Sequence, residues 1–158
     1  MRYHATKSLP KHLAKNLDTS IPELEKLANH HRRVVRAAVA ENPNTPTPIL
    51  EKLANDEEGM VRLSVLKNPN TPLSILEKGI QSPHGWVRAA VAGNSSLSTS
   101  DLEKLANDKA YEVRGAVAWN PNTPAPILEK LANDENEHVR KCATKQIRID
   151  VNVITYWD

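Results

Sequence analysis

Apolar residues recur along this chain with a period of 26 residues. The clearest marker is a Val-Arg pair that begins at residue 35 and returns at residues 61, 87, 113 and 139. In the copy at 113–138, apolar or small residues stand at the helical spacing i, i+3 and i+4, first from Val113 and again from Leu128. Each copy therefore predicts two short helices, each with one apolar face. A fixed period of this length is typical of a solenoid, in which each unit packs only on its neighbours.

Proline and polar residues mark the predicted helix ends within each copy. Asn120 precedes Pro121, and a residue before proline is biased away from helical geometry, so the helix that begins near residue 113 is predicted to end there. Thr123 is predicted to cap the next helix, with Pro124 at its first position. Asp134 is predicted to cap the helix after that.

The period predicts one repeat domain, residues 1–158. Its copies span 9–34, 35–60, 61–86, 87–112 and 113–138, with a tail or N-terminal cap at 1–8 and a truncated closing copy at 139–158. Val153, Ile154 and Trp157 are expected to supply the core of the closing copy. Ordering one unit costs about 26–50 kcal/mol in backbone entropy, whereas each of its roughly four large aliphatic residues returns only about 1.5–3 kcal/mol. The copies are therefore expected to stack, because none can fold alone.

The string VRxAVAxNPNTPxxILEKLAND recurs with few changes, notably at residues 35–56 and 113–134. It resembles the repeats of the leucine-rich repeat variant family and, more distantly, HEAT-type helical repeats. The resemblance implies an all-α, right-handed solenoid without strands, in which one helix of each pair is either α or 3₁₀. It also implies a non-enzymatic protein. The family's founding member carries a cysteine-ligated iron–sulfur cluster ahead of its repeats, but residues 1–34 contain no Cys, so no cluster is expected here.

Composition narrows the function classes. The sequence has no Phe, only 4% aromatic residues and 39% hydrophobic residues, which indicates a core of small aliphatic side chains in closely stacked layers. A single cysteine, Cys142, excludes an internal disulfide and cannot by itself form a zinc or iron–sulfur site. No apolar run approaches about 18 residues, and the first residues do not resemble a signal peptide. We expect a soluble, cytoplasmic protein without a metal or other cofactor.

The charge is uneven along the chain. Residues 1–40 hold eight Lys/Arg and three Asp/Glu, a net charge of +5, whereas residues 41–158 hold thirteen and sixteen, a net charge of −3. Nucleic acid is one partner that fits the basic end, and a solvated cap is the competing interpretation. A metal site there is not expected, because no Cys or third His lies at ligand spacing. The candidate polyanion-binding residues are His30, His31, Arg32, Arg33 and Arg36.

Two polar ladders accompany the repeat: Arg36, Arg62, Arg88, Arg114 and Arg140, and Asn42, Asn68, Asn94 and Asn120. The arginines either bind phosphate or carboxylate groups or pair with an Asp that stands six residues before them, and we favour pairing. Because Ser82 replaces the Asp before Arg88, Arg88 is expected to be the free member. The asparagines are expected to satisfy backbone groups at helix ends rather than to bind a peptide.

Ligand specificity in a repeat array is expected where the copies differ. Two such columns, four residues apart on one helix face, read Glu41, Lys67, Gly93, Trp119, Lys145 and Ala37, Leu63, Ala89, Gly115, Lys141. Trp119 is the exceptional member and is either a binding anchor or packed on a neighbouring loop. Trp86 and Tyr111, in the variable turns, present the same choice. The candidate binding residues are Trp119, Tyr111, Trp86, Lys67, Lys141, Lys145 and Arg88.

These observations favour a non-enzymatic scaffold that binds a protein or peptide along the variable helix face. The alternative is nucleic-acid binding through the basic N-terminal copy. A catalytic site near His84 and Arg88 in the irregular third copy is the least favoured hypothesis, because no Gly-rich phosphate loop, Ser/His/Asp pattern or paired carboxylate motif indicates catalysis. No membrane partner is expected.

Overall fold

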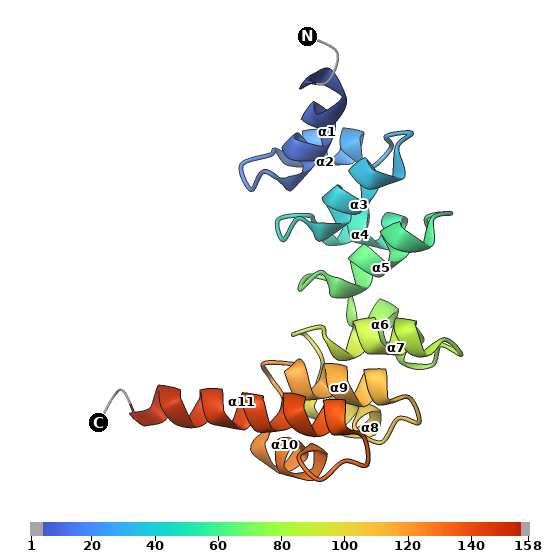
Figure 1. Cartoon of the computed structure of the whole chain (residues 1–158). Helices are drawn as coiled ribbons and strands as arrows, with labels where there is room; N and C mark the ends of the chain where they lie inside the picture. Colours follow the sequence, from blue (N-terminus) through green and yellow to red (C-terminus); the bar gives the residue numbers. More distant parts are fainter. Residues whose placement is uncertain (1–4, 156–158) are drawn as a thin grey trace. The chain divides into compact units, whose positions relative to one another are not determined.

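The chain folds into α-helices joined by short turns. The computed structural model describes the backbone of residues 5–155 and the side chains of residues 9–149, and the described backbone contains no strand, which confirms the predicted all-α class. The helices form two compact units, Met1–Leu76 and Glu77–Asp158. In chain order (Figure 1) they are α1 (Ala5–Lys15), α2 (Ile21–Leu27), α3 (Arg33–Glu41), α4 (Thr47–Leu53), α5 (Gly59–Lys67), α6 (Leu73–Ile80), α7 (Gly85–Ala92), α8 (Thr99–Leu105), α9 (Tyr111–Trp119), α10 (Ala125–Leu131) and α11 (Glu137–Thr155).

Within each unit, the odd-numbered helices pack on one another. In the first unit α3 packs against both α1 and α5, and in the second unit α9 packs against both α7 and α11 (Figure 1). The even-numbered helices cover them: α2 and α4 pack against α3, while α8 and α10 pack against α9. Each predicted repeat is therefore one inner, odd-numbered helix and one outer, even-numbered helix. Both helices of each described pair are α-helical, so the 3₁₀ form is not adopted there.

The central inner helix of each unit, α3 or α9, is buried on most sides, because the inner helices of the neighbouring repeats cover two sides and the outer helices cover a third. In α9, Val117 and Ala118 are fully buried. The spacing predicted Ala116 in the core instead of Ala118, and Ala116 is only half-buried. The outer helices bury one stripe, as predicted: Leu128 and Leu131 in α10 are each 1% exposed. Small side chains on the inner helices allow their axes to approach closely, which fits a chain without Phe.

The prediction that Thr123 caps the outer helix is wrong. The N-cap position lies one residue later, and the Thr123 side chain bonds to a different helix. α10 begins at Ala125, and Pro124 occupies the N-cap position. The Thr123 hydroxyl instead donates to the carbonyl of Val117 in the preceding helix, at an Oγ1–O distance of 2.6 Å. Thr45 makes the equivalent bond in an earlier repeat, also at 2.6 Å. The repeated threonine therefore closes the turn between the inner and the outer helix.

The predicted Asp134 cap is also wrong. The helix that follows it, α11, begins at Glu137, and Asp134 lies in the turn before it. There Asp134 Oδ1 accepts the backbone N–H of Asn136 at 2.8 Å. The aspartate orders the turn, and its carboxylate binds Arg114, at the start of the same copy.

The last helix, α11, is longer than the repeat pattern allows, at 19 residues. Gln146 and Ile147 stand at the positions that Asn120 and Pro121 occupy one repeat earlier, so no proline interrupts the helix. The result is the long red helix in Figure 1. The expected core residues of this closing copy lie outside the residues whose side chains are described: Val153, Ile154 and Trp157.

Candidate functional site

The asparagine ladder joins neighbouring repeats. Asn120 is buried at the end of α9 and donates through Nδ2 to the carbonyls of Ala92 and Asn94, one repeat earlier, at 2.7 and 2.8 Å. Its Oδ1 accepts the N–H of Asn122 at 2.9 Å. Asn68 makes the equivalent bonds within the first unit. As predicted, these side chains satisfy backbone groups, although two of the groups belong to the preceding repeat.

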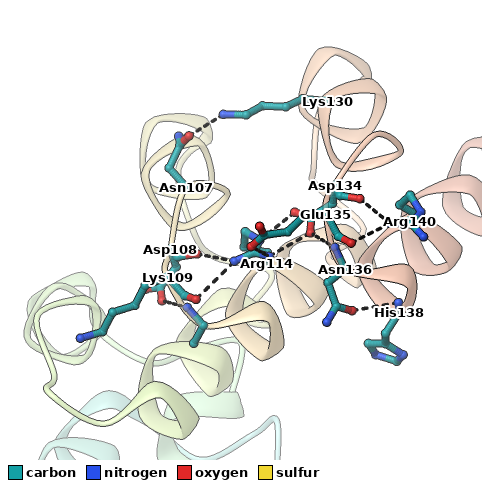
Figure 2. Close-up of polar contacts among 11 residues, drawn as sticks. Asn107, Asp108, Lys109, Arg114, Lys130, Asp134, Glu135, Asn136, His138 and Arg140 are labelled. Carbon is teal, nitrogen blue, oxygen red and sulfur yellow. Dashed lines mark hydrogen bonds and ion pairs between the residues drawn. The ribbon is translucent and has the colours of Figure 1, made fainter.

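Three ladder arginines hold the carboxylate of the Asp that stands 20 residues later, near the end of the same copy, in a bidentate ion pair. Figure 2 shows Arg114, which donates from Nε to Asp134 Oδ2 at 2.7 Å and from Nη2 to Oδ1 at 2.9 Å. Its remaining nitrogen, Nη1, donates to the backbone carbonyls of Asp108 and Lys109 at 2.8 and 3.4 Å. In Arg114, where Nη2 also contacts Glu135 Oε1 at 3.2 Å, all three guanidinium nitrogens are therefore engaged. The other two pairs are Arg36 with Asp56 and Arg88 with Asp108.

The observed pairing corrects the expectation for Arg88. The Asp six residues before each arginine was the predicted partner, whereas the observed partner stands 20 residues after the arginine. Arg88 is 8% exposed and bound by Asp108, so it is not the free member of the ladder. The arginine that lacks an Asp at the later position is Arg62, because the sequence has Ser82 there.

The same ion pairs couple folding to acid pH. The hydrogen bond from the partner arginine is the largest cause that holds the pKa of each ladder aspartate below its ordinary value, and this applies to Asp56, Asp108 and Asp134. A carboxyl group with a lower pKa in the folded than in the unfolded state stabilises the fold above its unfolded pKa of about 3.9. That stabilisation is lost as the pH falls through the folded pKa.

We therefore expect the free energy of unfolding to decrease as the pH is lowered from about 5 to about 2. Urea denaturation followed by circular dichroism at neutral pH and across this range measures the effect. The Asp134→Asn variant should show a shallower decrease, because one of the titrating carboxyl groups is gone. An equal slope in the two proteins would contradict the assignment of Asp134 to this pH dependence.

Two arginines of the predicted polyanion site, Arg33 and Arg36, have carboxylate partners. Arg36 is 9% exposed and paired with Asp56, so it does not face solvent as an anion receptor. Arg33 Nη1 lies 3.6 Å from Glu58 Oε1. Residues 9–60 together hold seven Lys/Arg and eight Asp/Glu, a net charge of −1. The segment that is basic in the sequence is therefore opposed by acidic residues of the next repeat.

The two histidines of this segment stack on each other, with ring centroids 4.4 Å apart. His30 Nδ1 accepts the backbone N–H of Arg32 at 3.1 Å. Burial is the largest cause that lowers the pKa of His30, and the neighbouring charges of His31, Arg32 and Arg36 act in the same direction. The lowered pKa favours the neutral form of His30, which weakens its contribution to a polyanion site.

The structure brings together two predicted binding residues, Trp119 and Lys145. Lys145 Nζ lies 4.8 Å from the centroid of the Trp119 ring, a cation–π contact. Trp119 is the last residue of α9 and is 45% exposed. One repeat earlier the column has Gly93, where an added Cβ would contact only carbonyls of its own helix, at 3.7 and 3.8 Å. Trp119 therefore has a cation from the following repeat beside it and no side chain at the preceding position.

The same column carries an ion pair in the first unit. Lys15 Nζ lies 2.9 Å from Glu41 Oε2, and a hollow of about 180 Å³ beside them is also lined by Asn42 and Pro43. Lys67, the next member, is exposed. Lys15 was not predicted as a member of this column, because the first copy is degenerate. The spacing of 26 residues between Lys15 and Glu41 was the signal in the sequence that could have identified it. Residues one period apart in this column thus contact each other at the surface.

The other two predicted aromatic residues lie away from Trp119. Tyr111 is 43% exposed and meets the His138 ring edge-on, with centroids 6.5 Å apart. Trp86 is 53% exposed and stacks with His84, with centroids 6.0 Å apart. Both residues are at the N-terminal ends of inner helices, whereas Trp119 is at a C-terminal end. The structure therefore does not join the three aromatic residues in one site.

The second variable column contributes mostly to packing between repeats. Ala37 is 4% exposed, and Gly115 is buried where an added Cβ would contact His138 Cδ2 at 3.5 Å. The column reaches the surface in α11, where Lys141 Nζ pairs with Glu137 at 2.6 Å. Lys141 is thus exposed but already engaged by a carboxylate on its own helix.

The chemistry of the variable face suits binding. It offers an aromatic ring with an adjacent cation, and its neighbouring side chains supply charge pairs.

Among the residues with described side chains, no group of three or more His, Cys, Asp or Glu is placed to hold a metal ion. Cys142 is buried, with Sγ 3.6 Å from His138 Nε2. No helix in the described part of the chain has both the length and the apolar composition to cross a membrane.

Comparisons with known proteins bear on the repeats. The sequence model of the family described as leucine rich repeat variant matches residues 33–58 and 111–136, which contain α3 with α4 and α9 with α10. Among solved structures, the chain is similar to one described as "a leucine-rich repeat variant with a novel repetitive protein structural motif". The two are 23% identical, with a TM-score of 0.42, and the match covers 89% of this chain and 66% of that chain, just under two thirds of its length. A comparison with curated proteins gave no match. Because the family matches coincide with helix pairs of the structure, the chain is a helical repeat protein in which residues 33–58 and 111–136 are similar to repeats of the leucine-rich repeat variant family.

Proposed function

We propose that this chain is a non-enzymatic scaffold that binds a protein or peptide through the variable column at the C-terminal ends of its inner helices. The observation that carries the proposal is the exposed Trp119 ring with Lys145 beside it. Trp is among the residues most enriched at binding hot spots, because its large ring removes much apolar surface from water on contact. A partner that presents an apolar or aromatic side chain next to a carboxylate matches this pair.

The occupied framework directs binding to the variable column. The Asn120 amide donates hydrogen bonds to backbone carbonyls. The Arg114 guanidinium group donates to Asp134 and to two backbone carbonyls. Polar side chains that already have strong partners offer little to a ligand or to a reacting group. The same argument supports a binding role over catalysis, since catalysis needs polar groups that are positioned and available.

The nucleic-acid alternative has weaker support. It rested on the +5 charge of residues 1–40, but Arg33 and Arg36 have carboxylate partners. Phosphate binding would have to displace these acidic side chains. DNA or RNA binding that weakens steeply with salt and is lost in Arg33→Glu would favour this alternative over the scaffold.

The scaffold proposal predicts that Trp119 dominates partner binding. A peptide selected from a displayed random library against the folded chain should lose about tenfold or more in affinity for Trp119→Ala, because hot-spot truncation costs about 2 kcal/mol or more and tenfold corresponds to about 1.4 kcal/mol. Fluorescence anisotropy with a labelled peptide measures the affinity, and circular dichroism confirms that the variant is folded. Lys67→Glu tests the same column in the first unit.

Glu112→Ala provides a matched control, because Glu112 is exposed at the other end of α9. This variant should bind the peptide with unchanged affinity. If neither Trp119→Ala nor Lys67→Glu weakens binding, the variable column is not the binding face and the proposal fails.

A further inference from the structure

The ladder arginines use two separate edges of the guanidinium group. In Arg114, Nη1 is fixed by the carbonyls of Asp108 and Lys109, which leaves the edge formed by Nε and Nη2 to hold the Asp134 carboxylate. We call this arrangement a closed clamp. The carbonyls orient the group, and the carboxylate then fills a fork that is already in place (Figure 2).

Two other ladder arginines have the carbonyl anchors without the carboxylate. Arg140 Nη1 donates to the carbonyls of Asp134 and Glu135 at 2.7 and 2.8 Å, and Figure 2 shows it beside the closed clamp of Arg114. Arg62 Nη1 donates to the carbonyls of Asp56 and Glu57 at 2.7 and 2.9 Å. Among the described side chains of its own unit, neither guanidinium group takes part in an ion pair with a carboxylate.

The pose of Arg62 matches that of a closed clamp. A Cβ added at Gly59 would lie 3.6 Å from Arg62 Nη2, and a Cβ added at Gly85 would lie 3.8 Å from Arg88 Nη2. The two guanidinium groups therefore sit over equivalent glycines at nearly the same distance, although only Arg88 holds an Asp. Arg62 is also exposed, whereas Arg88 is buried. The Nε–Nη2 edge of Arg62 is therefore held in a fixed orientation in which it can donate to an oxyanion.

We propose that Arg62 and Arg140 are open clamps that each bind the side-chain carboxylate of an acidic residue in a protein partner. The closed clamps carry the assignment to a carboxylate, because they hold one through two bonds, at 2.6 and 2.9 Å in Arg88. Fixed orientation reduces the entropy lost on binding and favours bidentate contact. The inference goes beyond the Trp119 face, because Arg140 lies in the first turns of α11 and Trp119 ends α9.

Nuclear magnetic resonance of the arginine Nε–Hε groups tests the proposal on the full chain. Sodium acetate replaces sodium chloride stepwise at constant ionic strength. The Arg62 and Arg140 signals are assigned by their disappearance in the Arg62→Lys and Arg140→Lys variants. The Arg62 and Arg140 signals should shift saturably with acetate, and the signals of Arg36, Arg88 and Arg114 should shift at least fivefold less. An absence of shifts at Arg62 and Arg140, or equal shifts at the closed clamps, overturns the proposal.

Three comparisons sharpen the test. Inorganic phosphate, titrated in the same way, should bind no more tightly than acetate, and tighter phosphate binding overturns the assignment to a carboxylate. Arg140→Lys keeps the charge but removes the fork, so the Nζ–Hζ signal of the new lysine should show no saturable acetate response while circular dichroism stays unchanged. Trp119→Ala should keep the acetate response, which separates the fate of the open clamps from that of the proposed peptide face.

Discussion

Replacing Asp134 with Ala is expected to lower the free energy of unfolding by about 3–5 kcal/mol. The substitution removes the carboxylate that Arg114 holds through two hydrogen bonds and leaves a buried guanidinium group without its counter-ion. Both side chains are less than a tenth exposed, at 9% for Arg114 and 8% for Asp134, so water cannot replace the lost partner. Urea denaturation monitored by circular dichroism measures the change.

Glu135→Ala is the matched control for this prediction. Glu135 also contacts Arg114, with Nη2 and Oε1 3.2 Å apart, but its side chain is 86% exposed. An exposed ion pair contributes only about 0–1 kcal/mol, so this variant should be nearly as stable as the parent. Similar losses in the two variants would show that burial of the Asp134 pair does not matter.

A double replacement separates the cost of an unpaired charge from the value of the pair. Arg114→Met combined with Asp134→Leu removes both charges and should be more stable than Asp134→Ala alone. Apolar residues of similar volume often replace a buried ion pair without loss. A double variant that is less stable than Asp134→Ala would contradict this account.

Asn120→Ala is expected to lower the free energy of unfolding by about 2–6 kcal/mol, because each buried polar group left without a partner costs about 1–3 kcal/mol. The Ala92 carbonyl is the last of α7, where no helical N–H can reach it, and it depends on Asn120 Nδ2. The N–H of Asn122 loses its acceptor at the same time. Thermal and urea denaturation of the purified variant measure the loss.

Asn122→Ala is the control for the asparagine ladder. The Asn122 side chain is exposed and donates to the carbonyl of Ser95, and solvent can take over that bond. Its loss should cost about 1 kcal/mol or less. Equal destabilisation by the two substitutions would argue against a special role for the buried Asn120 amide.

Part of the candidate site could be predicted from the sequence. Trp119 and Lys145 stand one period apart in a column that varies, so the repeat itself places them on neighbouring units. Their cation–π contact at 4.8 Å depends on how closely α9 and α11 approach, which the period does not specify. The separation of Trp86 and Tyr111 from Trp119 likewise depends on which end of an inner helix each residue occupies.

The sequence by itself determined the helix pairs and their core. The helix ends and the apolar faces depend on features that act over a few residues of one repeat. These features are the prolines, the spacing of Val117, Leu128 and Leu131, and the absence of proline at Ile147. Local backbone sterics and apolar spacing therefore decide where each helix ends and which face it buries. These features can be read without knowing how the units stack. The same local rule accounts for the length of α11.

Only the tertiary structure decided which of several regularly spaced side chains contact each other. Asp134 stands both 20 residues after Arg114 and six residues before Arg140, and the sequence alone favoured the wrong partner. The carboxylate binds Arg114, while Arg140 receives only the backbone carbonyl of Asp134. The physical reason is that a strictly periodic sequence offers each side chain several partners at repeated intervals. The stagger between stacked helices, which is set by packing, then selects one of them.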